Sequence, residues 1–352
     1  MPSGERLLSL DVFRGLTMIW MISAGFGLSA FRDDPLMGPV ARQFEHIDWH
    51  GVAAWDMIQP FFMFIVGVAM PFSFGRRWAA GETWGRSLRH VLRRCALLIL
   101  FGLIARSIQA GKPVLDLINV LAQVSFTYLV AFLVLRKPWK TQAAVAFGML
   151  IVTWALYQFS GFADPWAKNN NFGWRLDQLV LNKNWGGAYA TFNCVPSAFN
   201  TVAGALAGQL LLAAMAPARK MKILAGTGVA LAAAGLALDP LVPLIKKIWT
   251  PSFAIYSTGY CLLALVFFYW LCDIAGRKNW ASAIVMVGSN SIFIYLFYEI
   301  LGRWMRQTAP VFTGWAIDWW GPWGKVLTAC AIIAFQIWVC AWLYRRKIFF
   351  KV

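Results

Sequence analysis

Two histidines and two aspartates lie close together in one polar stretch that leads into an apolar run. The chain has three histidines in all, and His46 and His50 stand in this stretch with Asp48 and Asp56. A histidine ring has a pKa near neutrality, so it can take up and release a proton at working pH. A nearby carboxylate can hold such a ring in one orientation and tautomer. His46 is therefore a candidate general base, and Asp56 is a candidate for orienting it.

Other interpretations of these residues stay open. His46 could equally be an ordinary solvated loop histidine. His50 is the weaker candidate, expected beside the substrate, and His90 lies in a basic stretch with an expected structural role. A His-x3-His spacing before a helix is a weak pattern for a metal site, so we predict no metal. Asp56 precedes Pro60, and a proline frees backbone carbonyls for a cavity, so we expect Asp56 to face a polar cavity rather than lipid.

Membrane helices must position these residues. The chain is 60% hydrophobic and only 13% charged, whereas a soluble domain carries about 25% charged residues. Its apolar runs continue for about 20 residues, the length of a transmembrane helix, while strands of a membrane barrel alternate over about 10. The sequence predicts an all-α, polytopic integral membrane bundle that forms a single domain over residues 1–352.

About ten spans are predicted, and the basic residues indicate their orientation. The predicted spans are 10–31, 53–74, 92–109, 115–135, 141–160, 191–214, 221–239, 252–273, 281–302 and 324–344. Of the 32 lysines and arginines, 20 fall on one set of connections and 10 on the other. Because positive charge is retained on the cytoplasmic side, both termini are predicted to be cytoplasmic and the loop with His46 to face outward.

The net charge of +17 is also explained by membrane topology. The basic residues lie between apolar runs, where they set topology, so we predict membrane lipids as partners and no nucleic acid. Basic cytoplasmic loops can in addition hold a phosphorylated ligand. Arg14 lies three residues after Asp11, which puts both on one helix face, either as a local ion pair or as an anion contact that Asp11 orients. The candidate cofactor contacts are Arg14, Asp11, Arg89, Arg93, Arg94 and Gln123.

The predicted outer loops are rich in Trp, Asn and Gly. Tryptophan at a span end is ordinarily an interfacial anchor, but a flat apolar ring beside hydrogen-bonding groups is also what binds a sugar. The Gly-Ser-Asn-Ser run at 288–291 either packs closely against neighbours or lines a cavity. The candidate substrate contacts are Trp49, His50, Ser23, Lys246, Trp249, Ser252 and Asn290.

Several blocks of residues together resemble a known family. They are Ser9-Leu10-Asp11-Val12-Phe13-Arg14-Gly15, His46 with Trp49 and Gly51, Asp56 with Pro60-Phe61-Phe62, Trp249-Thr250-Pro251-Ser252-Phe253, and Gly288 with Asn290-Ser291-Ile292. In this order they resemble the heparan-α-glucosaminide N-acetyltransferase family and its bacterial relatives, nearly from end to end. Ser23 stands where that family often has an asparagine, and Ile245 replaces the asparagine of an Asn-Lys pair.

The resemblance implies an activity for the chain. The lysosomal member uses cytosolic acetyl-CoA to acetylate the amine of a terminal glucosamine across the membrane. Its essential histidine matches His46, its neighbouring aspartate matches Asp56, and a homodimer is implied by analogy. We therefore expect a multi-pass acetyltransferase of the bacterial inner membrane that transfers acetyl from cytoplasmic acetyl-CoA to a periplasmic amino sugar. The alternative is a transporter for N-acetylglucosamine or a similar sugar, since some bacterial relatives carry that label.

Overall fold

The computed structural model describes residues 7–183 and 188–350, and the described chain is helical. One backbone bridge, between Gly51 and Ile245, is its only β pairing. The helices are α1 (Leu8–Ile22), η1 (Ala24–Phe31), α2 (Gly38–Arg42), η2 (Ala54–Met57), α3 (Ile58–Ala79), α4 (Trp84–Ala110), α5 (Val120–Val134), α6 (Trp139–Gln158), α7 (Phe172–Leu181), η4 (Thr191–Asn193), α8 (Cys194–Leu212), α9 (Pro217–Leu238), α10 (Pro251–Phe268), η5 (Tyr269–Ile274), α11 (Ser282–Ser289), α12 (Ser291–Trp320) and α13 (Pro322–Arg345).

The predicted helical membrane bundle is confirmed. Each of the ten predicted spans coincides with helix, and within the described residues five helical segments are long and apolar enough to cross a membrane, or seven if each bent pair is one span. The five segments are Ala54–Ala79, Thr191–Leu212, Pro217–Leu238, Pro251–Ile274 and Pro322–Arg345. The count of ten therefore stays a prediction, because α5 has only 15 residues and α4 carries several arginines.

Two predicted spans are bent rather than straight. The first turns by 50° after α1, where Ala24 and Phe26 join two glycines in positive φ. The predicted span 281–302 turns by 78° at Asn290, between α11 and α12. Helix α12 then continues through Pro310 to Trp320, well beyond the predicted end at residue 302.

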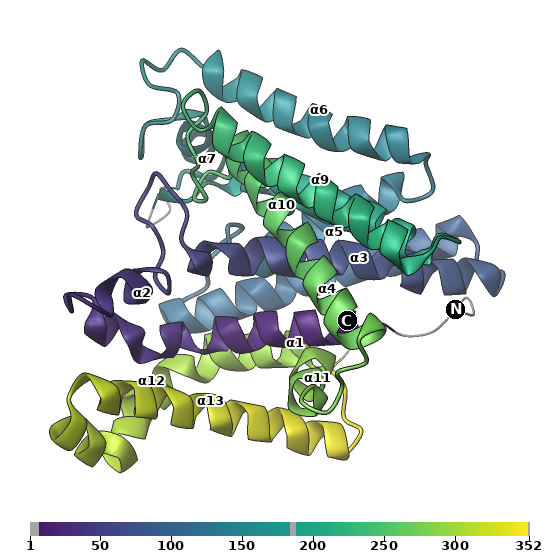
Figure 1. Ribbon diagram of the computed structural model, residues 1–352. Helices are drawn as coiled ribbons and strands as arrows, with labels where there is room; N and C mark the ends of the chain where they lie inside the picture. Colours follow the sequence, from purple (N-terminus) through teal and green to yellow (C-terminus); the bar gives the residue numbers. More distant parts are fainter. Residues whose placement is uncertain (1–6, 184–187, 351–352) are drawn as a thin grey trace.

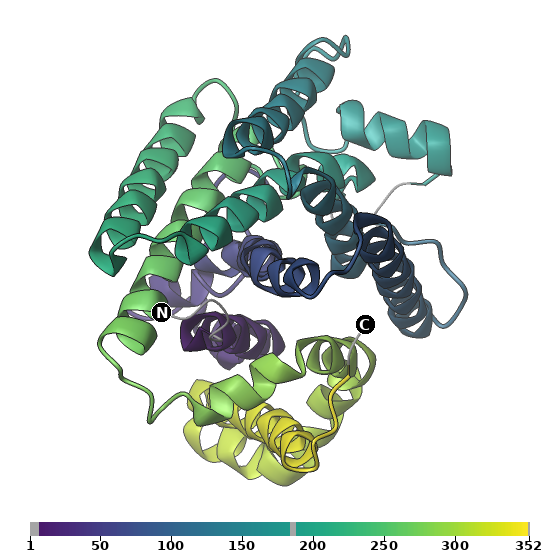
Figure 2. The ribbon, with the colours of Figure 1, turned by 90° about the vertical axis from the view of Figure 1, so that its right-hand side faces the viewer.

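Helices α1 and α3 lie in the middle of the bundle, with α9 and α10 on one side and α11–α13 on the other (Figures 1 and 2). Helix α3 makes its most extensive contact with α8. A Cβ atom added at Gly67 of α3 would lie 2.0 Å from the Thr201 carbonyl oxygen, and one at Gly204 of α8 would lie 2.2 Å from the Phe64 carbonyl oxygen. Glycine at both positions therefore lets the two backbones approach closely, as small residues do between membrane helices.

Both ends of the described chain lie at the same end of the bundle. The Asn290 carboxamide donates to the carbonyl of Ile348 and accepts from the backbone N–H of Phe350. Next to it, Gly288 packs against the backbone of Asp11 near the start of α1. This arrangement fits an even number of membrane crossings. The polar stretch with the two histidines follows α1 and η1 and so lies at the opposite end.

Candidate functional site

His46 and Asp56 are hydrogen-bonded to one another. The distance from His46 Nδ1 to Asp56 Oδ1 is 2.7 Å, and the aspartate side chain is only 2% exposed. The other carboxylate oxygen accepts from the backbone N–H of Ala53 at 3.1 Å and of Ile47 at 3.4 Å. A carboxylate held in this way favours the tautomer with a proton on Nδ1. The lone pair of Nε2 is then available to a reacting group.

Lys246 completes this pair from a distant part of the chain. The backbone N–H of Gly51 donates to the carbonyl of Leu244 at 2.9 Å, which brings the loop before α10 against the histidine loop. Lys246 Nζ consequently lies 3.7 Å from Asp56 Oδ1 and 3.2 Å from His46 Nδ1. Burial lowers the pKa of Lys246 to about 8 and lowers the pKa of His46 below its ordinary value. A neutral imidazole thus faces a buried ammonium–carboxylate pair.

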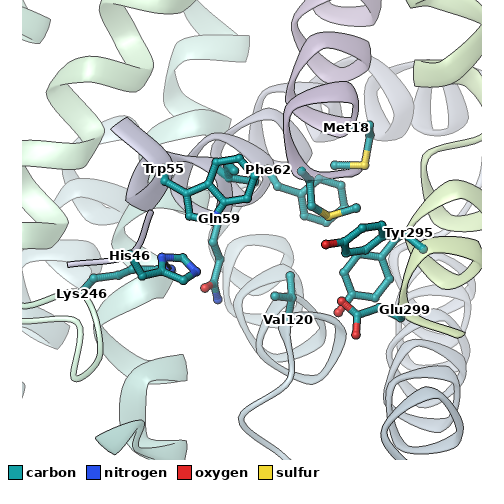
Figure 3. Close-up of a pocket in the computed structure, with 12 residues that line it drawn as sticks. Met18, His46, Trp55, Gln59, Phe62, Val120, Lys246, Tyr295 and Glu299 are labelled. Carbon is teal, nitrogen blue, oxygen red and sulfur yellow. Dashed lines mark hydrogen bonds between the residues drawn. The ribbon is translucent and has the colours of Figure 1, made fainter. Parts of the chain in front are cut away.

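The histidine opens into a cavity of about 210 Å³. Its side chain is 44% exposed, since it forms part of the cavity wall. In Figure 3, His46 and Lys246 lie on one side, Tyr295 and Glu299 lie on the other, and Gln59 lies between them. The full lining is Met18, Met21, His46, Trp55, Ile58, Gln59, Phe62, Val120, Lys246, Tyr295, Tyr298 and Glu299.

Two polar residues of this cavity have roles that the sequence analysis missed. Gln59 Nε2 donates to Gln123 Oε1 at 2.6 Å, so one amide fixes the other. Glu299 Oε2 accepts from Gln109 Nε2, which joins α12 to α4. Glu299 is an ionisable residue inside a predicted span, where such residues are functional candidates by default, but no role at the site was predicted for it. Gln59 gave no comparable signal.

Two further cavities continue from the first toward the opposite end of the bundle. Phe62 lines both the histidine cavity and a second cavity of about 220 Å³. A third cavity of about 470 Å³ shares Arg14, Arg94 and Tyr128 with the second. The third is lined by Arg14, Ser73, Arg77, His90, Arg93, Arg94, Leu97, Tyr128, Ile292 and Phe350. Three adjacent cavities thus form a path of cavities between a basic mouth and the histidine, and the side chain of Phe62 lies between the first and the second.

Three of the six predicted cofactor contacts line this path, and Asp11 lies beside one of them. Arg14 and Arg94 line both lower cavities, and Arg93 lines the third. The guanidinium of Arg94 donates to the Tyr128 hydroxyl and lies 4.5 Å from the centre of that ring. Asp11 lies 3.8 Å from Arg14.

The remaining two predicted cofactor contacts lie elsewhere. Arg89 is exposed and lines none of the three cavities. Gln123 bonds to Gln59 beside the histidine cavity and not at the basic mouth.

The structure brings only Lys246 among the predicted substrate contacts into the histidine cavity. Trp49 donates to the Trp166 carbonyl, His50 lies 2.8 Å from Asp239, Trp249 donates to Asn200, and Ser252 donates to the Pro243 carbonyl. Ser23 lines a separate cavity between η1, α12 and α13, and Asn290 is hydrogen-bonded to the C-terminal residues Ile348 and Phe350. The hydrogen bonds of Trp49, His50, Trp249, Ser252 and Asn290 are thus made to other parts of the protein, which is a structural role.

Comparison with known proteins gives two findings. The family described as "Domain of unknown function (DUF5009)" matches residues 6–181, the half of the chain that contains the histidine pair and all four arginines of the basic mouth. The chain is also 31% identical over 99 residues to heparan-alpha-glucosaminide N-acetyltransferase of Homo sapiens and 29% identical over 102 residues to that of Mus musculus. These alignments cover 28% and 29% of this chain but only 13% and 14% of the two relatives.

Proposed function

We propose that this chain, which belongs to the DUF5009 family, is a multi-pass membrane acetyltransferase of the bacterial inner membrane. Acetyl-CoA is the donor and enters from the cytoplasmic end. The acceptor is an amino sugar or related saccharide at the periplasmic end. The similarity to two N-acetyltransferases supports the general activity.

One observation carries the proposal: a basic mouth and a paired histidine lie at opposite ends of one run of cavities. The mouth offers Arg14, Arg77, Arg93 and Arg94 to the phosphates of CoA, and guanidinium groups bind phosphate in paired hydrogen bonds. The middle cavity is walled by apolar residues such as Val66, Met70 and Leu98, which suit the pantetheine arm. The thioester would then reach His46.

The proposed reaction balances without another co-reactant. The acceptor nitrogen or oxygen bonds to the acetyl carbonyl carbon while His46 Nε2 takes its proton. The C–S bond breaks, and the imidazolium returns the proton to CoA, which leaves as the thiol. A route through acetyl-His46 has the same net result, because the ring nitrogen accepts the acetyl group first and passes it to the acceptor. The two routes differ in whether labelled enzyme forms before the acceptor is added.

The experiment uses purified protein in proteoliposomes with acetyl-labelled acetyl-CoA and glucosamine. Labelled N-acetylglucosamine is the expected product. If CoA neither binds nor is consumed, while the vesicles take up N-acetylglucosamine, the proposed transfer is wrong and the protein is a sugar transporter. Chemical crosslinking of the same sample tests the proposed homodimer.

Glu299 is proposed to hold the amine of the acceptor. It lies across the cavity from His46 (Figure 3), and one carboxylate oxygen is already bonded to Gln109. We expect Glu299→Gln to raise KM for glucosamine about tenfold, the effect of losing one charge-assisted hydrogen bond of about 1.4 kcal/mol. KM for acetyl-CoA should stay unchanged, since Glu299 lines none of the lower cavities. An equal rise in both KM values would contradict this role.

The rate of transfer is expected to follow a bell-shaped pH profile. Burial holds the pKa of His46 below its ordinary 6.5, assisted by Lys246 and opposed by Asp56. Because the neutral ring is the base, kcat/KM falls as the pH drops through the lowered pKa of His46. Burial places the pKa of Lys246 at about 8, so the cation beside Asp56 is lost above that pH and the rate falls again.

The variant Lys246→Met distinguishes the two limbs of this profile. It should remove the alkaline limb and move the acid limb to higher pH, because a positive charge beside the ring is lost. Rates measured from about pH 5 to about pH 10 on wild type and variant check both shifts. An alkaline limb that survives in the variant would show that Lys246 does not cause it.

CoA affinity is expected to depend on the basic mouth. The double variant Arg93→Gln, Arg94→Gln should weaken CoA binding about tenfold or more and reduce its salt dependence, since two phosphate contacts are lost. Arg89→Gln is the matched control, because Arg89 is a neighbouring arginine of α4 that lines none of the cavities. Calorimetric titration at two salt concentrations measures both. Equal weakening by Arg89→Gln would argue against a built phosphate site.

A further inference from the structure

A separate cavity of about 370 Å³ lies between η1, α12 and α13. Its wall is mainly apolar, yet it contains two cationic side chains. The lining is Ile22, Ser23, Ala24, Gly27, Ser29, Tyr298, Gly302, Arg306, Pro310, Ile317, Lys325, Thr328, Ala329, Ile332 and Gln336. The break after α1 helps to form it, because residues 24–27 in positive φ turn the chain so that η1 packs against α13. Only Tyr298 is shared with the histidine cavity.

The two cations form no close ion pair in the described part of the chain, and Arg306 interacts with the Glu299 carboxylate only at longer range. Among residues 7–183 and 188–350, neither Arg306 nor Lys325 forms an ion pair within 4 Å. The guanidinium of Arg306 lies 5.6 Å from the centre of the Tyr298 ring. Both residues are exposed, so a group outside the protein can reach them, and a cation at the level of the bilayer is stabilised by an opposite charge. A phosphate group would supply that charge to both residues.

Gln336 adds a second, independent observation. It lines the same cavity and is fully buried, and its amide oxygen has no hydrogen-bond partner. Its amide nitrogen reaches only the Met305 sulfur, at 3.7 Å. A buried polar atom without a partner in the protein indicates a ligand group or a water molecule that pairs with it. A hydroxyl group next to the phosphate could donate to it.

The tryptophans of the α12–α13 turn indicate the depth of this cavity in the membrane. Four of them are exposed, with Trp319 exposed by 82%. They are Trp315, Trp319, Trp320 and Trp323. Exposed tryptophans at the end of a span lie at the level of lipid headgroups. Lys325 follows this group within one helical turn, so the cationic cavity lies close to the headgroup level.

The exposed surface of α13 supplies the apolar continuation. This helix is long and apolar enough to cross a membrane, and most of its apolar stretch is not buried inside the protein. Phe335, Trp338 and Trp342 lie on its exposed side. An acyl chain can therefore follow α13 from the cavity into the bilayer, while a free phosphate gains nothing from this surface.

We propose that this cavity binds the headgroup of an anionic membrane lipid, with its phosphate between Arg306 and Lys325 and a headgroup hydroxyl on Gln336. The acyl chains lie along α13. Phosphatidylglycerol has the required phosphate, hydroxyls and net charge. This proposal does not depend on acetyl transfer. Through Tyr298, the lipid also touches the wall of the histidine cavity.

Native mass spectrometry of the purified full chain tests the site with phosphatidylglycerol and with phosphatidylcholine of the same acyl chains. Wild type should bind one phosphatidylglycerol about tenfold more tightly than phosphatidylcholine, the difference expected for one charge-assisted contact. Arg306→Gln with Lys325→Gln should remove that preference. The matched control is Arg303→Gln with Lys112→Gln, which removes two exposed charges outside the cavity.

Two more arms separate the sources of the phosphate. Ala329→Phe fills the cavity and keeps both cations, so lipid binding should be lost while the melting temperature stays close to that of wild type. Glycerol 1-phosphate and inorganic phosphate should not displace the lipid at millimolar concentration. Displacement by either compound would show that the cavity is a simple anion site and would overturn the proposal that it binds a lipid. An unchanged preference in the charge double variant, or no preference in wild type, would overturn the proposal altogether.

Discussion

Replacing His46 with alanine is expected to lower kcat for acetyl transfer by about 10²–10⁴-fold, the usual contribution of a general base. The structure gives the physical reason. The His46 ring lines the cavity, and its Nδ1 lies 2.7 Å from the Asp56 carboxylate, which orients the ring as a base. KM for acetyl-CoA should change little, since His46 lines neither of the two lower cavities. Single-turnover and steady-state rates measure the two quantities separately.

His50→Ala is the matched control for this loss. His50 lies in the same loop, but it pairs with Asp239 at 2.8 Å and lines none of the cavities described. Its variant should retain the wild-type rate. Asp56→Asn should lower kcat nearly as far as His46→Ala, because an amide no longer selects the tautomer with Nδ1–H. If His50→Ala were the inactive variant, the assignment of the base to His46 would be wrong.

Replacing Gly67 with alanine is expected to destabilise the fold by about 1–3 kcal/mol, the usual cost of overpacking a well-filled interior. The added Cβ would lie 2.0 Å from the Thr201 carbonyl oxygen, which belongs to backbone and cannot rotate away. Helices α3 and α8 would therefore separate, and the cavities that α3 lines would change shape. Unfolding in a titration of denaturing detergent, followed by circular dichroism, measures the loss.

Gly75→Ala is the control for this substitution. Gly75 lies on the same helix, and a Cβ added there meets nothing within 4 Å. The change should be neutral or slightly stabilising, since alanine favours helix over glycine by about 1 kcal/mol. Equal destabilisation by both variants would mean that α3 and α8 do not cross as closely as described.

Local information in the sequence was sufficient for the class of protein and for one part of the site. Long apolar runs predict membrane helices wherever they are packed, because a bilayer requires every backbone group to be paired within its own helix. His46 and Asp56 are ten residues apart, so a short loop that turns into η2 and α3 can bring them together. Arg14, Arg93 and Arg94 likewise lie where the charge bias places them, at one end of the bundle.

Only the tertiary structure decided which distant residues share the site. Lys246 reaches Asp56 because a backbone bridge joins its loop to Gly51, and Glu299 reaches the cavity because α12 packs beside α1. Asn290 was expected at the substrate but is hydrogen-bonded to the C-terminal segment instead. No local pattern records such contacts, since they depend on how helices far apart in the chain pack against one another. The sequence therefore determined the helices and the proximity of His46 to Asp56, while the packing of the helices determined the cavities and what surrounds the histidine.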